Sequence, residues 1–192
     1  METLKNIAFA VTGSFCGISG VLEQMKKLVD MEFNVIPILS ETVYSTDTRF
    51  HKADEIKEKI AAITGMNKIL HKITETEPLG PRKTADLLII SPCTGNTLSK
   101  LANGINDSCV TMAAKSILRN GLPVVIGIST NDGLSGSAVN IGVLLNRKNI
   151  YFVPFYQDDP VNKQRSLVAK PELLIPAVMA AAKGEQLQPI LA

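Results

Sequence analysis

The stretch Leu87-Leu88-Ile89-Ile90-Ser91-Pro92-Cys93-Thr94-Gly95-Asn96-Thr97 joins a run of large apolar residues to a series of small hydroxyl, thiol and amide side chains. An uninterrupted apolar run is typical of a strand buried on both faces, as in a parallel sheet. In open parallel sheets, ligands bind beyond the carboxyl ends of the strands. We therefore expect the polar loop at residues 91–97 to belong to a binding site.

The N-terminal part of the chain has the same organisation. Residues 7–11 and 33–39 form two apolar runs, and Pro37 favours a position at the sheet edge for the second one. Between them, apolar residues recur at the spacing of one helical face. They are Ile18, Val21, Leu22, Met25, Leu28 and Val29. This β-α-β order predicts parallel strands joined by a right-handed crossover.

The rest of the chain continues the alternation. We expect strands at residues 124–128 and 151–155, and helices at 53–63, 139–145 and 177–182. A further helix is expected directly after Asp107, which would be its N-cap. Residues 40–50 and 129–136 are predicted to be polar loops, 76–84 a turn or extended loop, and 186–192 a tail. The fold class that this order predicts is α/β, a three-layer, Rossmann-like, doubly wound parallel sheet.

Length and composition predict a single domain. The 192 residues are 45% hydrophobic and 20% charged, as in a globular protein. We expect one domain over 1–192, with its core at about residues 5–155 and a C-terminal helix and tail at 156–192. A net charge of +2 disfavours nucleic-acid or membrane-surface binding.

Location and metal content are also predicted. No apolar stretch reaches the roughly 18 residues of a membrane span, and the N-terminus does not read as a signal peptide. The three cysteines, Cys16, Cys93 and Cys109, lack paired metal-ligand spacing. We therefore expect a cytoplasmic chain with reduced cysteines and no metal.

Four polar segments follow the predicted strands, at residues 12–17, 40–48, 91–97 and 129–132. In a parallel sheet they meet at one edge, where hydroxyls, amides and helix N-termini can bind an anionic group. The alternative is that each is polar only because loops are exposed. Gly13 allows close backbone approach, but the spacing of Gly13, Gly17 and Gly20 is not the dinucleotide fingerprint, which favours a mononucleotide.

Two segments carry candidates for binding anions and for acid–base chemistry. Ser40, Thr42, Ser45 and Thr46 offer hydroxyl donors to a phosphate, as does Ser14. Arg49 adds a positive charge, although a surface ion pair is an equal alternative. His51 has the side chain of a general base, and the alternative is an exposed histidine at a helix start.

Asn96 and Asn131 are the candidates for contacting a carbonyl, imide or carboxylate, because an amide both donates and accepts hydrogen bonds. The alternative for each is a capping or loop asparagine. Cys16 and Cys93 have no neighbouring base, which favours packing roles. Asp158-Asp159-Pro160 is typical of a turn. The following Lys163, Arg165 and Lys170 either bind an acidic substrate or are solvated.

The sequence resembles the homo-oligomeric flavin-containing decarboxylase superfamily. The motif that carries this is Pro92-Cys93-Thr94-Gly95-Asn96-Thr97 followed by Lys100, Gly104 and Asp107, together with the Gly13-Ser14 loop. The resemblance covers about residues 5–155. It implies an FMN site formed by Gly13, Ser14, Ser40, Thr42, Pro92, Thr94 and Asn96. It also implies trimers or assemblies of trimers, with Asn131 near the substrate end.

The chain bears a closer resemblance to the dipicolinate synthase B subunits. The resemblance rests on Ser45-Thr46-Asp47-Thr48-Arg49-Phe50, Glu77-Pro78-Leu79-Gly80-Pro81, Gly127-Ile128-Ser129-Thr130-Asn131-Asp132 and Gln157-Asp158-Asp159-Pro160. Two later segments extend it: Ser166-Leu167-Val168-Ala169-Lys170 and Gln186-Leu187-Gln188-Pro189-Ile190-Leu191.

This second resemblance implies an oxidoreductase subunit. Such a subunit acts with a separate A subunit to oxidise dihydrodipicolinate to dipicolinate in the mother cell of a sporulating bacterium. Arg49 is then a candidate for binding the small dicarboxylate, on the grounds of its charge. The catalytic candidates are Asn96, Asn131 and Arg49.

Three alternatives remain at this point. In the first alternative, the A subunit performs the redox step with NAD(P), and this chain is regulatory or structural. In the second alternative, the chain is an FMN-dependent decarboxylase of a cysteinyl substrate. Two departures from the decarboxylase motifs weaken it: Phe50-His51 reverses their His-Phe order, and Ser129-Thr130-Asn131-Asp132 keeps only the asparagine of their substrate segment. In the third alternative, the chain is a non-catalytic module that binds phosphate-like anions.

Overall fold

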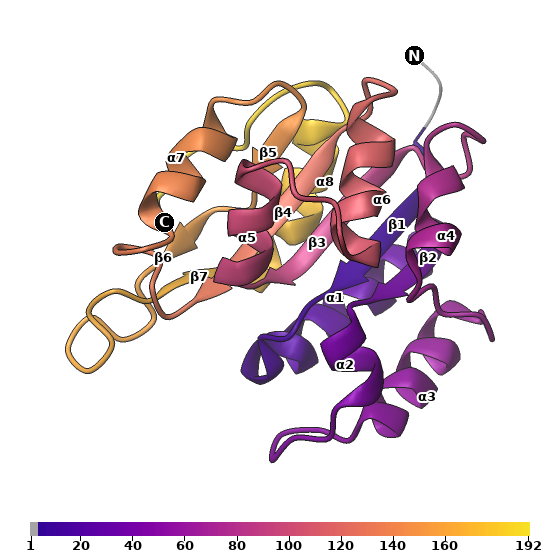
Figure 1. Cartoon of the computed structure of the whole chain (residues 1–192), viewed down its shortest axis with the longest axis horizontal. Coiled ribbons are helices and arrows are strands. Elements are labelled where there is room, and N and C mark those ends of the chain that lie inside the picture. Colours follow the sequence, from indigo (N-terminus) through magenta and orange to yellow (C-terminus); the bar gives the residue numbers. More distant parts are fainter. Residues whose placement is uncertain (1–3) are drawn as a thin grey trace.

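A central β-sheet lies between two layers of helices in the computed structural model, which describes residues 4–192 (Figure 1). The seven strands of the described residues are β1 (Asn6–Val11), β2 (Asn34–Leu39), β3 (Leu87–Cys93), β4 (Val124–Thr130), β5 (Ile150–Phe152), β6 (Phe155–Tyr156) and β7 (Leu167–Ala169). The α/β, doubly wound fold class expected from the sequence is confirmed.

The helices are α1 (Ile18–Asp30), α2 (Glu41–Ser45), α3 (Ala53–Thr64), α4 (Ile73–Thr76), α5 (Gly95–Ala102), α6 (Cys109–Leu118), α7 (Ala138–Leu145) and α8 (Leu174–Ala181). Three short 3-10 turns are η1 (Phe15–Gly17), η2 (Glu77–Leu79) and η3 (Pro171–Leu173). Helices α1, α3 and α8 contribute to the core on one face of the sheet, and α5, α6 and α7 to the core on the other. Within residues 4–192, no helix combines the length and hydrophobicity needed to cross a bilayer.

The order of the strands brings the predicted loops together. The sheet runs β2-β1-β3-β4, with all neighbouring pairs parallel, and β5 also pairs in parallel with the first half of β4. Parallel strands end at the same edge of a sheet, so the segments after β1, β2, β3 and β4 share that edge. Pro37 lies in β2, which is an edge strand, as predicted.

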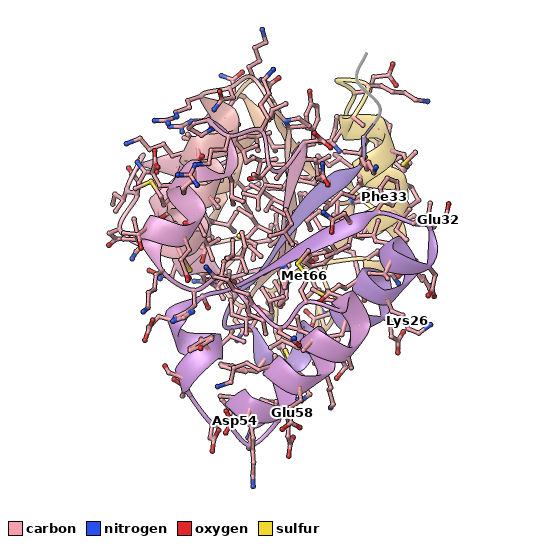
Figure 2. All side chains as sticks on the ribbon, turned by 90° about the vertical axis from the view of Figure 1, so that its right-hand side faces the viewer. Lys26, Glu32, Phe33, Asp54, Glu58 and Met66 are labelled. Carbon is pink, nitrogen blue, oxygen red and sulfur yellow. The ribbon has the colours of Figure 1, made fainter. Side chains whose placement is uncertain are left out.

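Alternating strand residues fill the two cores. In β1, Ile7, Phe9 and Val11 are fully buried in the core that includes α1, α3 and α8, whereas Ala8 and Ala10 are buried in the other core. Burial on both faces explains the unbroken apolar runs in the sequence. Figure 2 shows the outer surface of the helices, where charged side chains such as Asp54 and Glu58 of α3 point away from the sheet.

Three expectations about strands were wrong. Strand β7 was not predicted, and it runs antiparallel to both β4 and β6, so the sheet is mixed and not wholly parallel. The predicted strand at 151–155 is divided between β5 and β6. Strands β3 and β4 also continue further than expected, so Ser91 and Ser129 lie in strands and not in loops.

Local expectations were corrected in four places. Residues 40–50 contain α2, and residues 76–84 begin with helical turns at the end of α4 and in η2. Ser108, and not Asp107, is the N-cap of α6, because its side chain accepts a hydrogen bond from the Thr111 N–H. Asp107 instead pairs with Lys100 at 2.8 Å. The predicted tail packs on the sheet, where the Gln186 amide bonds both backbone groups of Phe152.

Candidate functional site

A cavity of about 250 Å³ lies at the carboxyl ends of β1, β3 and β4. The segment that connects β6 to β7 forms its remaining wall. The cavity is lined by Gly13, Ser14, Cys16, Thr94, Gly95, Ser129, Thr130, Asn131, Asp158, Lys163, Ser166 and Val168. Three of the four polar segments predicted from the sequence therefore meet around one space.

Thr12 fixes the relative positions of the segments after β1 and β3. Its buried hydroxyl donates to the Pro92 carbonyl at 2.7 Å and accepts from the Thr94 N–H at 3.1 Å. A second link joins β1 to β4, because the hydroxyls of Ser14 and Ser129 are 2.6 Å apart. These hydrogen bonds hold the backbone of the cavity wall in a defined geometry.

The segment after β2 approaches the same wall from its other side. A Cβ atom on Gly13 would be 3.6 Å from the Thr42 methyl group, so the segments after β1 and β2 lie side by side here. The Ser40 hydroxyl, which precedes α2, is buried and has no hydrogen-bond partner within residues 4–192. A buried hydroxyl without a partner is energetically costly, and a bound ligand is one group that would remove this cost.

A cluster of polar side chains lies beside the start of α5. The Asp132 carboxylate accepts hydrogen bonds from the hydroxyls of Thr130 and Ser137. These bonds, chiefly the one from Thr130, lower the pKa of Asp132 below its usual value. A Cβ on Gly95 would be 2.7–2.8 Å from oxygens of all three residues. Because a carboxylate already occupies this helix terminus, a phosphate would be repelled from it.

The structure brings together only some of the predicted site residues. Gly13, Ser14, Thr94 and Asn131 line the cavity, and Ser40 and Thr42 belong to the adjoining segment after β2. Pro92 lies next to the cavity wall and lines a separate space of about 30 Å³ between β3, β4 and α8.

The remaining candidates lie outside the cavity lining. Asn96 is exposed on the first turn of α5, one residue beyond Gly95. Arg49 is exposed, with its guanidinium 4.8 Å from the ring centroid of Phe50. The His51 backbone N–H is 3.2 Å from the Thr48 hydroxyl, and His51 is not a lining residue. Roles for these residues stay predictions.

Sequence reasoning offered Lys163 as one binder of an acidic substrate, with solvation as the alternative, but it did not place the segment between β6 and β7 at the strand-end site. Asp158, Lys163 and Ser166 line the cavity from this segment, and Lys163 pairs with Asp158 at 3.0 Å. The predicted turn at Asp158-Asp159 is present, because Asp159 accepts hydrogen bonds from Asn162. The short strands that position the segment gave no strong pattern in the sequence.

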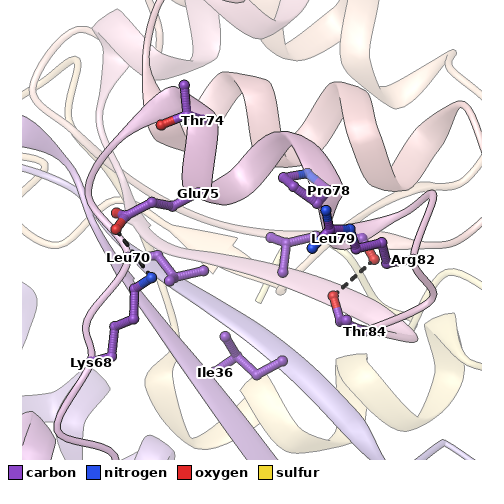
Figure 3. Close-up of a pocket in the computed structure, with 9 residues that line it drawn as sticks. All are labelled: Ile36, Lys68, Leu70, Thr74, Glu75, Pro78, Leu79, Arg82 and Thr84. Carbon is purple, nitrogen blue, oxygen red and sulfur yellow. Dashed lines mark hydrogen bonds and ion pairs between the residues drawn. The ribbon is translucent and has the colours of Figure 1, made fainter.

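A larger cavity of about 350 Å³ lies beside β2 and α4, and it contains none of the predicted site residues (Figure 3). Its carboxylate, Glu75, is fully engaged. One oxygen lies 3.4 Å from the Lys68 ammonium, and the other accepts from the N–H groups of His71 and Lys72. These backbone bonds, first that of His71, lower the pKa of Glu75. The charges here stabilise the start of α4, so we place the candidate site at the β1–β3–β4 cavity.

Comparisons with known proteins show the family of this chain. A family model described as Flavoprotein matches residues 1–157, which include the segments after β1, β2, β3 and β4. The chain belongs to the Flavoprotein family. The cavity walls that follow β1, β3 and β4 lie within the matched range, whereas the wall formed by the segment between β6 and β7 lies after it.

Two relatives define its place within the flavoproteins. The dipicolinate synthase B subunit of Bacillus subtilis (strain 168) is 46% identical over 187 residues, which are 97% of this chain and 93% of that protein. The crystal structure of the dipicolinate synthase B subunit from Bacillus halodurans C is also 46% identical, with a TM-score of 0.89 over 98% of this chain and 96% of that one. This flavoprotein is therefore a member of the family of dipicolinate synthase B subunits.

The fold is shared more widely. The FMN-dependent cysteine decarboxylase SpaF is 18% identical, with a TM-score of 0.64 over 91% of this chain and 97% of that chain. At this identity the likeness shows a common fold and not a common reaction.

Proposed function

We propose that this flavoprotein is the B subunit of a dipicolinate synthase, and that with an A subunit it oxidises dihydrodipicolinate to dipicolinate. The observation that carries the proposal is the 46% identity to a dipicolinate synthase B subunit over nearly the whole chain. The cavity at the carboxyl ends of β1, β3 and β4 adds a site of the kind that this function needs.

FMN is the cofactor that we propose for this cavity. Ser14 after β1 lines the cavity, and Ser40 and Thr42 supply further hydroxyls from the adjoining segment after β2. The Ser40 hydroxyl in particular lacks a partner within the described residues, and a phosphate oxygen would accept its hydrogen bond. Helix α1 begins at the same sheet edge, and its N-terminus favours an anion. The donor set therefore fits the phosphate end of FMN.

The opposite wall suits the flavin ring and the substrate. Thr94 and Asn131 line the same space, although the Thr94 hydroxyl also caps α5 by accepting from the Thr97 N–H. Asn96 lies one residue beyond the lining residue Gly95. Asp132 blocks phosphate from the start of α5, which favours the orientation with the phosphate toward β2. The cavity is slightly smaller than the roughly 300–1,000 Å³ of typical ligand sites, so part of the ligand would extend beyond its mouth.

Bound FMN would supply a two-electron acceptor. The protein's own contribution is to orient the substrate, because an amide such as Asn131 binds a carboxylate or ring nitrogen without changing its own charge. The alternative in which NAD(P) on the A subunit accepts the hydride assigns this chain the same binding residues but no electron transfer.

We propose that the chain forms homo-oligomers based on trimers, in addition to its contact with the A subunit. Helix α7 supports this, because Val139 and Val143 are one turn apart and expose 67% and 40% of their surface. An apolar face of this kind is typical of a protein–protein contact. We also propose a cytoplasmic location, in the mother cell of a sporulating bacterium.

Reconstitution with the A subunit tests this function. The chain is purified alone and with its A subunit, its flavin absorption spectrum is recorded, and dipicolinate formation from dihydrodipicolinate is measured. We expect the two subunits together to be active and each alone to be much less active. Full activity of the A subunit alone would contradict a catalytic contribution by this chain.

The decarboxylase alternative makes a different prediction in the same preparation. It requires carbon dioxide release from a peptide with a C-terminal cysteine, and loss of that release in His51→Ala. Carbon dioxide release together with no dipicolinate formation would favour the decarboxylase over our proposal.

A further inference from the structure

Lys163 is the cation that the structure offers to an acidic substrate at the carboxyl-edge cavity. Among the described residues that line this space, Lys163 is the single lysine or arginine, and Asp158 is the single carboxylate. Arg49, which the sequence suggested for this purpose, is not in the lining and lies over Phe50. Charge and position together therefore favour Lys163.

The segment that carries Lys163 is held in place by several hydrogen bonds. The Lys163 N–H donates to the Asp159 carbonyl at 2.8 Å, and the Ser166 N–H donates to the Lys163 carbonyl at 3.0 Å. The Gln157 side chain also spans the segment and donates to the Gln164 carbonyl at 2.8 Å. The lysine therefore starts from an ordered backbone.

The same segment is tied to the segment that carries Asn131. The Leu134 N–H donates to the Arg165 carbonyl at 2.9 Å. A Cβ on Gly133 would be 2.7 Å from the Leu167 side chain, so the two segments are in direct contact. Asn131 and Lys163 therefore reach one cavity from two segments that are fixed to each other, and they can bind two ends of one small molecule.

The Lys163 ammonium has capacity for a ligand. An ammonium group donates three hydrogen bonds, and the structure uses one of them for Asp158. The Lys163 side chain is 51% exposed and that of Asp158 is 25% exposed, so an incoming carboxylate can reach the ammonium. Asp158 raises the pKa of Lys163, which keeps the ammonium charged near neutral pH.

We propose that Lys163 binds one carboxylate of the substrate and makes this site selective for dicarboxylates over monocarboxylates. Asp158 positions the ammonium before the substrate arrives, and Asn131 contacts the other end of the substrate. This inference rests on the proposed function for the choice of a pyridine dicarboxylate as ligand.

The test compares the binding of dipicolinate and picolinate, which differ by one carboxylate, by calorimetry on the wild-type chain purified with its A subunit and supplied with FMN. We expect Lys163→Met to weaken dipicolinate binding about 10-fold or more, because a charge-assisted hydrogen bond is lost. Picolinate binding should change far less, so the ratio of the two affinities should approach that of a non-selective site. Lys163→Arg should keep most of the preference for dipicolinate over picolinate.

The control is Lys183→Met, which removes an exposed lysine after α8 that is not a cavity residue. An unchanged affinity ratio in Lys163→Met, or equal changes in Lys163→Met and Lys183→Met, would overturn the inference. A wild-type complex that binds the two acids equally would also overturn it. FMN binding and dipicolinate formation are measured separately, so a failure of the proposed function is distinguished from a failure of this assignment.

Discussion

Thr12 and Thr94 are joined by a hydrogen bond of 3.1 Å between the Thr12 hydroxyl and the Thr94 N–H. The two residues belong to segments separated by most of the first half of the chain, and this bond holds the two segments together beside the carboxyl-edge cavity, which Thr94 lines. The same hydroxyl donates to the Pro92 carbonyl, so one buried side chain sets the spacing of β1 and β3 where they end.

We expect Thr12→Val to destabilise the fold by about 1–3 kcal/mol, because the Thr94 N–H loses its acceptor in a buried place. Urea unfolding followed by circular dichroism measures this change. Thr12→Ser keeps the hydroxyl, so its free energy of unfolding should fall much less. Equal stabilities of Thr12→Val and Thr12→Ser would show that the hydroxyl does not hold this wall.

Gly95→Ala should lower the stability of the chain by about 1–3 kcal/mol, since a Cβ there must displace the side chains of Thr130, Asp132 and Ser137. The matched control is Gly142→Ala in α7. Nothing lies within 4 Å of a Cβ at that position, and alanine should stabilise the helix by about 0.5–1 kcal/mol. Thermal unfolding compares the two variants, and we expect their changes in stability relative to wild type to have opposite signs.

Asp132 should make stability depend on pH at the acidic end. Hydrogen bonds from Thr130 and then Ser137 lower the pKa of this carboxyl in the folded chain. The ionised form therefore stabilises the fold at pH values above about 3.9, the ordinary pKa of an unfolded aspartate, and this contribution falls as pH drops through the folded pKa. The stability difference between wild type and Asp132→Asn should accordingly shrink from pH 7 to pH 3. A constant difference across that range would contradict the assignment.

The three cysteines should differ in reactivity. Burial raises the pKa of the Cys93 thiol strongly and that of Cys109 to about 11, whereas Cys16 is exposed in the cavity lining. Because the thiolate is the reactive form, iodoacetamide at pH 8 should modify Cys16 alone in the folded chain and all three in urea. Mass spectrometry identifies the modified residue. Protection of Cys16 by added FMN is expected as well, and rapid native labelling of Cys93 would contradict its burial.

Much of the fold could be predicted because burial leaves a local signature. The apolar runs in β1 and β3 arise from burial on both faces of the sheet. The helical spacing in α1 arises because one face of that helix packs into the core on one side of the sheet. Strand β7 has three residues and depends on pairing with the end of β4, which local sequence does not reveal. The C-terminal segment was missed for a similar reason, because Gln186 is held by a distant backbone group of Phe152.

The site was predictable where it lies directly after a long strand. Gly13, Ser14, Thr94 and Asn131 all follow β1, β3 or β4, and the topology alone brings them together. The sequence alone did not distinguish Lys163 from Arg165 and Lys170, which do not line the cavity. Its position depends on the antiparallel pair β6 and β7 and on the contact between Gly133 and Leu167.

The central claim is that the carboxyl-edge cavity binds FMN with its phosphate beside Ser40. The most direct measurement is a fluorescence titration of FMN with wild type and Ser40→Ala, with Ser45→Ala as control, because the Ser45 hydroxyl already donates to the Glu41 carbonyl. We expect one FMN per wild-type chain, about 10-fold weaker binding by Ser40→Ala, and little change in Ser45→Ala. No saturable FMN binding by the wild type, or equal affinities for all three proteins, would contradict the claim.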